Sequence, residues 1–164
     1  MSGHASFYLL NQEHLKAVEK AWKPVEARLW WGRKKTTFPF IKDFYTYTTF
    51  LESYPYSGWI YTQVFLYFDD VFAYHDLELA KEANRISTGG ATITLFTHRD
   101  KEKIIHKLAP SQLSIDKLRY FAEEYYETPE EKQSSGESLL MAIELLHNCL
   151  QKIEPGKILM LHVG

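Results

Sequence analysis

The stretch that decides the fold is residues 91–97, which read ATITLFT. Threonines alternate with Ala91, Ile93 and Leu95, and β-branched residues at a period of two favour a strand. The polar residues 87–90 end in Gly-Gly directly before it and mark a clear break in the chain. Two further strands are predicted near the termini, over residues 4–10 and 157–163. Because a lone strand has too few partners to be stable, we expect these three to meet in one sheet.

The spans between these strands carry mostly helical patterns. Predicted helices cover residues 11–22, 24–31, 39–54, 57–71, 76–86, 101–108, 114–125 and 138–153. Residues 34–37 are expected to be a polar link and 128–136 a polar, acidic loop, whereas 154–156 (Glu-Pro-Gly) predicts a turn. Long helical connections favour crossovers, so we expect at least one parallel pair of strands.

These elements define the predicted class as α+β. We expect a single domain over residues 1–164 that is predominantly helical, with a small three-stranded mixed sheet formed by the N-terminal, middle and C-terminal strands. A stripe of aromatic and aliphatic side chains at spacings of three and four predicts the helix over 39–54. Fifteen aromatic residues lie between Phe38 and Tyr74, and this periodicity assigns most of them to the core.

Composition excludes several classes of protein. The 164 residues are 45% apolar and 24% charged, an ordinary globular balance, and the formal net charge is only −2. No apolar run is long enough for a transmembrane helix or a signal peptide, so we expect no membrane association. The single cysteine excludes an internal disulfide and favours the reducing cytoplasm.

No complete catalytic or metal-binding motif is present. His147 precedes Cys149, the only thiol, by two positions, which places the two on different sides of a helix. Cys149 is therefore predicted to be a small core residue. No pair of histidines has the four-residue spacing of a helical metal site, and no phosphate-binding loop occurs. We therefore predict no catalytic residue, no metal and no cofactor.

One loose cluster supports an alternative. Asp69 and Asp70 stand close in sequence to His75 and Asp76. Adjacent carboxylates with an imidazole can bind a divalent cation or transfer protons. The alternative hypothesis is therefore an enzyme or a small-ligand or metal-binding protein that uses Asp69, Asp70, His75 and the aromatic-rich segment.

The basic front of the chain suggests a second alternative. Trp30 and Trp31 are followed by Gly32 and by three cations, Arg33, Lys34 and Lys35. Aromatic rings beside cations are typical of single-strand nucleic-acid binding. A sequence pI near 6.4 argues against that partner, so nucleic acid is not expected. We instead predict that Trp30 and Trp31 contribute to a surface for a protein partner.

The acidic back of the chain gives the main partner-binding prediction. Carboxylates and tyrosines interleave in this stretch, a composition that steers a basic protein by charge while the rings supply contact area. The predicted partner-binding residues here are Glu123, Glu124, Tyr125, Tyr126, Glu127, Glu130 and Glu131.

The two ends of the chain resemble the YfbM-like family of small bacterial proteins of unknown function. The opening residues 5–10 (ASFYLL) lead directly into a helix, and a long apolar helix, a short turn and a strand ending in Val163-Gly164 close the chain. The resemblance covers about forty residues, and the match over 38–97 is poor. It implies an α+β single domain in a bacterial cytosol, in a family sometimes encoded beside toxin systems, and it carries over no catalytic motif.

Together these observations predict a non-enzymatic protein-interaction module. The leading hypothesis is a cytosolic immunity-type protein that binds and neutralises a toxin with a basic surface. The oligomeric state does not follow from the sequence.

Overall fold

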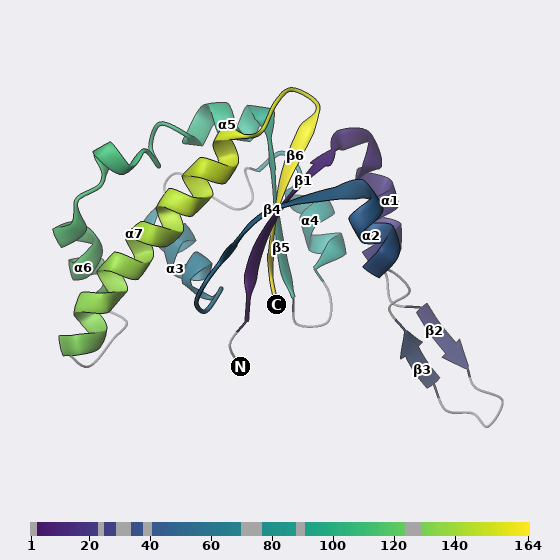
Figure 1. Cartoon of the computed structure of the whole chain (residues 1–164), viewed down its shortest axis with the longest axis horizontal. Coiled ribbons are helices and arrows are strands. Elements are labelled where there is room, and N and C mark those ends of the chain that lie inside the picture. The colour runs from purple at the N-terminus through teal and green to yellow at the C-terminus, as the bar shows by residue number, and fades with distance from the viewer. Residues whose placement is uncertain are drawn as a thin grey trace.

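The protein is built on a four-stranded antiparallel sheet. The computed structural model describes residues 3–22, 25–28, 34–37, 41–69, 77–87, 91–123 and 129–164. The strand order is β4-β1-β6-β5, with β1 (Ala5–Asn11), β4 (Thr48–Tyr54), β5 (Thr92–Thr97) and β6 (Lys157–Val163). A separate antiparallel ribbon pairs β2 (Val25–Arg28) with β3 (Lys34–Thr37) and stands away from the body (Figure 1).

Helices cover both faces of the sheet. One face is packed by α3 (Ile60–Tyr67), α5 (His98–Ile104), α6 (Ile115–Glu123) and α7 (Pro129–Gln151). The other is packed by α1 (Leu15–Trp22), α2 (Ile41–Tyr47) and α4 (Ala80–Ile86). Two single 3₁₀ turns, η1 (Gln12–His14) and η3 (Pro110–Gln112), complete the described elements. Figure 1 shows the sheet nearly edge-on between these two sets of helices.

The central strand β6 is buried on both faces. Leu159 and Leu161 belong to the core under α7, whereas Ile158 and Met160 belong to the core under α1 and α4. Side chains alternate between the faces of a strand, so a strand between two helical layers must be apolar at nearly every position. The sequence KILMLHV meets this requirement, which is why β6 lies inside the sheet rather than at its edge.

The prediction of a three-stranded mixed sheet is wrong, because a fourth strand lies inside the segment predicted as one helix. The helical part ends with α2 at Tyr47, where the Thr48 hydroxyl donates to the Phe44 carbonyl at 3.0 Å. Residues 48–54 then pair with β1 as strand β4. Thr48, Thr49 and Phe50 favour a strand, and the ladder to β1 outweighs the helical spacing of the aromatic residues.

The expected parallel pair is also wrong, since every ladder among the described strands is antiparallel. The connection from β5 to β6 explains this. The chain leaves one end of the sheet through α5 and descends through α6, and α7 then brings it back to the same end (Figure 1). A connection that runs along the sheet and back again returns to the end where it began, so the next strand is antiparallel to the one before it. The length of a connection does not reveal whether it returns in this way.

Other local predictions have mixed outcomes. The strands near both termini and at 92–97 are confirmed, as is the turn at Gly156, which has a positive φ of 80°. The Thr97 side chain and Asp100 form the capping box expected at the start of α5.

The predicted helix over 24–31 contains strand β2 instead, and the predicted link 34–37 is strand β3. The predicted acidic loop is wrong from residue 129 onward, because α7 begins at Pro129, a favoured first helical residue.

None of the described helices combines the length and apolarity needed to cross a membrane.

The carbonyl groups at the C-terminus of α7 are capped by a lysine side chain from a different helix. The Lys101 ammonium of α5 donates to the carbonyl oxygens of Gln151 at 3.0 Å and Ile153 at 2.7 Å. The last carbonyls of a helix lack partners within the helix and carry partial negative charge, so a cation placed there satisfies both needs. Lys101 thereby fixes α5 to the end of α7 from which β6 starts.

We expect Lys101→Met to lower the free energy of unfolding by about 1–2 kcal/mol, because two charge-assisted hydrogen bonds at a helix end are lost. Urea denaturation monitored by circular dichroism measures the change. The matched control is Lys103→Met on the same helix, at an exposed position, which should change stability by less than about 0.5 kcal/mol. Equal effects of the two substitutions would contradict the capping role.

Candidate functional site

The predicted partner-binding residues fall at the α6–α7 end of the molecule or outside the described residues. Glu123 ends α6, and Glu130 and Glu131 lie in the first turn of α7. These three are described at the level of the backbone only. The remaining predicted residues, Glu124, Tyr125, Tyr126, Glu127, Trp30 and Trp31, lie outside the described residues.

The described part of the α6–α7 end presents a tyrosine among charged side chains. Tyr120 is 71% exposed, the highest value among the exposed large apolar side chains described. The preceding residue, Arg119, contacts the carboxylates of Asp116 at 3.7 Å and Glu137 at 3.2 Å through its guanidinium group. Gly136 allows this approach, since a Cβ there would lie 2.4 Å from Cγ of Arg119. We call Asp116, Arg119, Tyr120 and Glu137 the Tyr120 surface.

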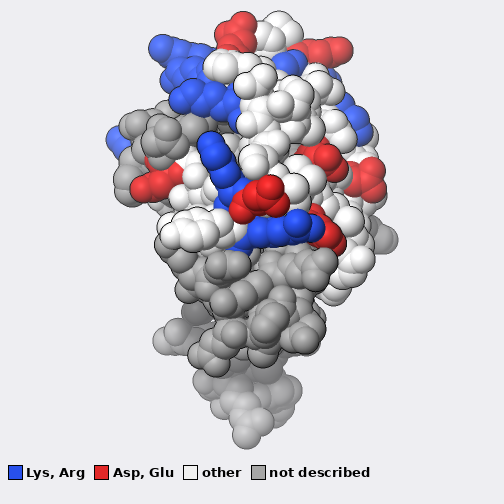
Figure 2. Space-filling model, turned by 90° about the vertical axis from the view of Figure 1, so that its left-hand side faces the viewer, with Lys and Arg blue, Asp and Glu red and all other residues white. Residues whose placement is uncertain are grey.

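The charges at this end are mixed rather than uniformly acidic. Figure 2 faces the side of the molecule that carries α6 and α7 and shows Lys and Arg beside Asp and Glu over its described part. Arg119 offsets Asp116 and Glu137 locally. Any acidic excess at this end therefore comes from the glutamates predicted from the sequence, not from the described side chains.

Neither alternative site is assembled by the described residues. Asp69 follows α3 and is exposed, whereas Asp70, His75 and Asp76 lie outside the described part of the chain. Within that part, no group of three or more His, Cys, Asp or Glu side chains is placed to hold a metal ion. Of the three cations in the nucleic-acid hypothesis, Lys34 and Lys35 belong to β3, whereas Arg33 lies outside the described residues. The nucleic-acid hypothesis therefore stays a prediction.

The single thiol is buried in the core, as the sequence predicts. Cys149 lies in the core cluster under α7, and burial raises its pKa to about 11. A thiol with that pKa stays protonated near neutrality, and the thiolate is the nucleophilic form. Cys149 thus packs as a small apolar side chain.

A small hollow lies between the end of β4, the start of α3 and the N-terminal half of α7. Its volume is about 200 Å³. The described residues that line it are uncharged, and aromatic rings alternate with hydroxyl and amide groups: Tyr54, Tyr56, Ser57, Trp59, Ile60, Gln63, Ser135 and Ser138. We call it the Trp59 hollow.

The inner wall of the Trp59 hollow is fixed by hydrogen bonding and ring packing. Tyr54, at the end of β4, is buried, and its hydroxyl donates to the Ser138 carbonyl of α7 at 3.1 Å. Its ring packs edge-on against Tyr61, with ring centres 5.8 Å apart, and against Tyr56 at 5.7 Å. The contact to Ser138 ties the strand to the helix across the hollow, so the wall is part of the core.

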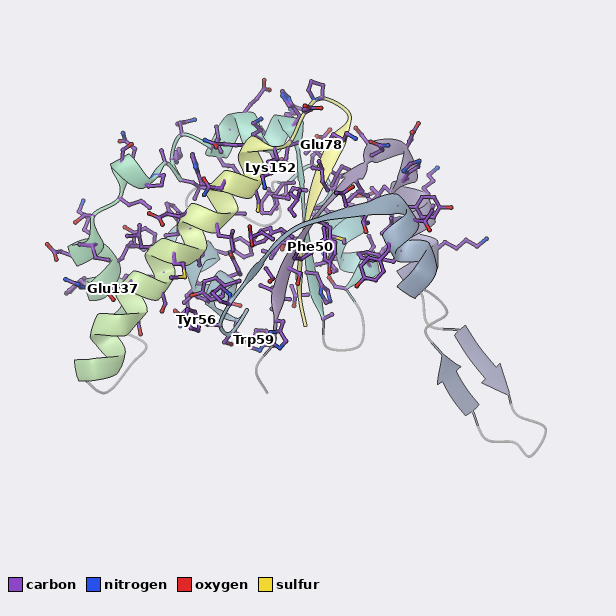
Figure 3. All side chains as sticks on the ribbon, viewed as in Figure 1. Phe50, Tyr56, Trp59, Glu78, Glu137 and Lys152 are labelled. Carbon is purple, nitrogen blue, oxygen red and sulfur yellow. The ribbon has the colours of Figure 1, made fainter. Side chains whose placement is uncertain are left out.

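Two aromatic rings stand at the mouth of the hollow. Tyr56 is 61% exposed and Trp59 is 47% exposed, and Figure 3 shows the two near each other at the same end of the molecule. The indole of Trp59 lies against the backbone at Gly3, where an added Cβ would be 3.1 Å from Nε1. The turn that carries both rings is held close to β1 by Gly58, whose Cβ would meet the Ala5 nitrogen at 2.6 Å.

Sequence reasoning missed the Trp59 hollow. It assigned Tyr54 and its aromatic neighbours to the core of two helices and placed residues 134–136 in a loop. The available signal is the pair Ser135 and Ser138, three positions apart and therefore on one side of α7. Two small polar residues there leave space beside α3 that larger side chains would fill.

No model of a known protein family matches this chain, and searches of curated proteins and of solved structures also returned no match. The resemblance of the two ends to the YfbM-like family therefore stays a prediction.

We expect Tyr61→Phe to raise the free energy of unfolding by about 1 kcal/mol. Tyr61 is only 1% exposed, and among the described residues its hydroxyl has no hydrogen-bond partner. Burial raises the pKa of this hydroxyl, whereas the edge-on contact of the ring with Phe7 at 5.4 Å survives the substitution. Urea denaturation measures the change, and the matched control is Tyr54→Phe, which loses the bond to Ser138 and should be destabilised by about 1 kcal/mol. A destabilised Tyr61→Phe protein would show that the hydroxyl has a partner.

The stability of the protein should fall as the pH drops below about 6.5, in part because of His162. This residue lies on β6 between the uncharged Ser6 of β1 and Ile93 of β5, and burial lowers its pKa below 6.5. Between the lowered pKa and 6.5 the unfolded chain binds more protons than the folded one, so stability rises with pH in that window. In His162→Gln, melting temperatures should fall less between pH 7 and pH 5 than in the parent protein, whereas His106→Gln, at an exposed position, should match the parent. Identical profiles for the parent and His162→Gln would show that His162 does not contribute.

Proposed function

We propose that this protein is a non-enzymatic protein-interaction module, an immunity-type protein of the cytosol that binds and neutralises a toxin. The observation that carries the proposal is the exposure of Tyr120 within the Tyr120 surface. Tyrosine supplies a large contact area with few rotatable bonds, and tyrosine, tryptophan and arginine dominate the residues that contribute most to binding between proteins.

The neighbours of Tyr120 support its use as an anchor. Arg119, directly before Tyr120 in α6, forms exposed ion pairs with Asp116 and Glu137, so charged groups of both signs lie on the same end of the molecule as Tyr120. Charged groups at the rim contribute mainly to specificity and to the rate of association, while the ring supplies buried area.

The proposed partner is basic. Glu123 and Glu124 follow Tyr120 in the sequence, and Glu127, Glu130 and Glu131 continue the acidic run. Lys132 is the only lysine or arginine between Glu123 and Glu137. Charge complementarity therefore favours a toxin with a positively charged surface, such as one that acts on nucleic acid. Because exposed ion pairs are screened by salt, association should slow as the ionic strength rises.

The test compares the proteins captured by tagged parent protein and by Tyr120→Ala from a lysate of the native host. A partner that uses the Tyr120 surface should be recovered at least about tenfold less with the variant, the effect of losing one anchor residue. The matched control is Tyr45→Ala, which removes another exposed tyrosine, on the far side of the sheet, and should capture the partner as the parent does. The captured protein should also be toxic when expressed alone and harmless when expressed with this protein.

Two results would contradict the proposal. One is the absence of any protein enriched by the parent over both an untagged control and an unrelated bait. The other is equal capture by the parent and by Tyr120→Ala, which would leave the exposed ring without a role in binding.

A further inference from the structure

We propose that the Trp59 hollow is a binding site for one neutral sugar ring. The proposal concerns a different surface from the Tyr120 surface and does not depend on it. It rests on three properties of the hollow: the exposed rings at its mouth, the uncharged hydrogen-bonding groups inside it, and its size.

The aromatic rings of Tyr56 and Trp59 are held in position by their neighbours, so they can form a surface on which a ligand stacks. Tyr56 packs edge-on against Tyr54, whose position is fixed by the bond to Ser138, and Trp59 lines the same hollow. Trp59 rests on the backbone at Gly3. Aromatic faces carry negative partial charge and attract the slightly positive C–H groups on one face of a sugar ring. Two exposed rings held in place at one mouth are suited to such a ligand.

The groups inside the hollow match the hydroxyl groups of a sugar. Gln63 carries an amide that both donates and accepts, and Ser135 and Ser138 contribute hydroxyl groups. These side chains come from α3 and α7, two rigid elements of the core, so their relative positions are set before a ligand binds. A ring with hydroxyl groups around its edge and C–H groups on its face can exchange hydrogen bonds with these hydroxyl and amide groups while its face packs against the aromatic rings.

The charge of the lining narrows the ligand class further. None of the described lining residues is an acid or a base. Among the described lining residues, a phosphate, carboxylate or amine would find no opposite charge to offset its loss of water, which is costly. Nucleotides, sugar phosphates and amino acids are therefore disfavoured, and neutral sugars are favoured.

The size of the hollow limits the ligand to one ring. Its volume of about 200 Å³ corresponds to roughly seven water molecules at the density of the liquid. Pockets that hold drug-sized ligands are larger, at about 300–1,000 Å³. The mouth is open at Tyr56 and Trp59, so the bound ring can be a free monosaccharide or the end of a glycan chain.

The experiment is a titration of the ¹⁵N-labelled full chain with neutral monosaccharides, namely glucose, galactose, mannose and N-acetylglucosamine. The chain has four tryptophans, and Trp59→Phe assigns the indole N–H signal of Trp59. At least one sugar should shift the signals of Trp59 and of the Gln63 side-chain amide and leave the other indole signals in place. The affinity should fall at least about tenfold in Trp59→Ala. Phe50→Ala, which removes an exposed ring elsewhere on β4, should bind as the parent does.

A second variant keeps the test decisive if Trp59→Ala does not fold. Gln63→Leu retains the rings and removes the amide, and it should also weaken binding at least about tenfold. The proposal is overturned if none of the four sugars shifts the Trp59 signal, if the shifts persist in both variants, or if adenosine and uridine shift it and the sugars do not. The last result would assign the hollow to a nucleobase.

Discussion

The fold depends on the burial of β6 between two layers of helices. Leu159 and Leu161 face α3 and α7, whereas Ile158 and Met160 face α1 and α4, so this one strand closes both cores. Its neighbours β1 and β5 bond to its two edges, and β4 adds to the outside of β1. A strand in this position cannot expose either face or either edge, and the remaining elements are arranged around that restriction.

Close approach between backbones determines the geometry of both candidate surfaces. Gly58 lets the turn before α3 lie against β1, and this places Tyr56 and Trp59 at the mouth of the Trp59 hollow. Gly136 lets Arg119 of α6 lie against α7, where it reaches Glu137. Neither glycine needs a positive φ for its role. Each is required because a side chain would occupy the space of a neighbouring residue.

The two surfaces suit different kinds of ligand. The Tyr120 surface combines charged groups with an exposed ring, as the rim and anchor residues of protein interfaces do. The Trp59 hollow is concave, small and uncharged in its described lining, an arrangement typical of a site for a small neutral group. The hollow uses Tyr54, which the helical spacing of the sequence alone assigns to the core.

The sequence by itself determined the elements whose signals are local. Alternation specified β1 and β5, and the apolar run after the turn at Gly156 specified β6. The Thr97–Asp100 capping box marked the start of α5, and the apolar register of residues 138–153 specified the longer part of α7. Only the tertiary structure decided that residues 48–54 form an edge strand, that all described strand pairs are antiparallel, and that Tyr54, Gln63 and Ser138 share a hollow. The reason is physical: local patterns reflect contacts within a few residues, whereas strand pairing and the space between two helices depend on contacts between residues far apart in the chain.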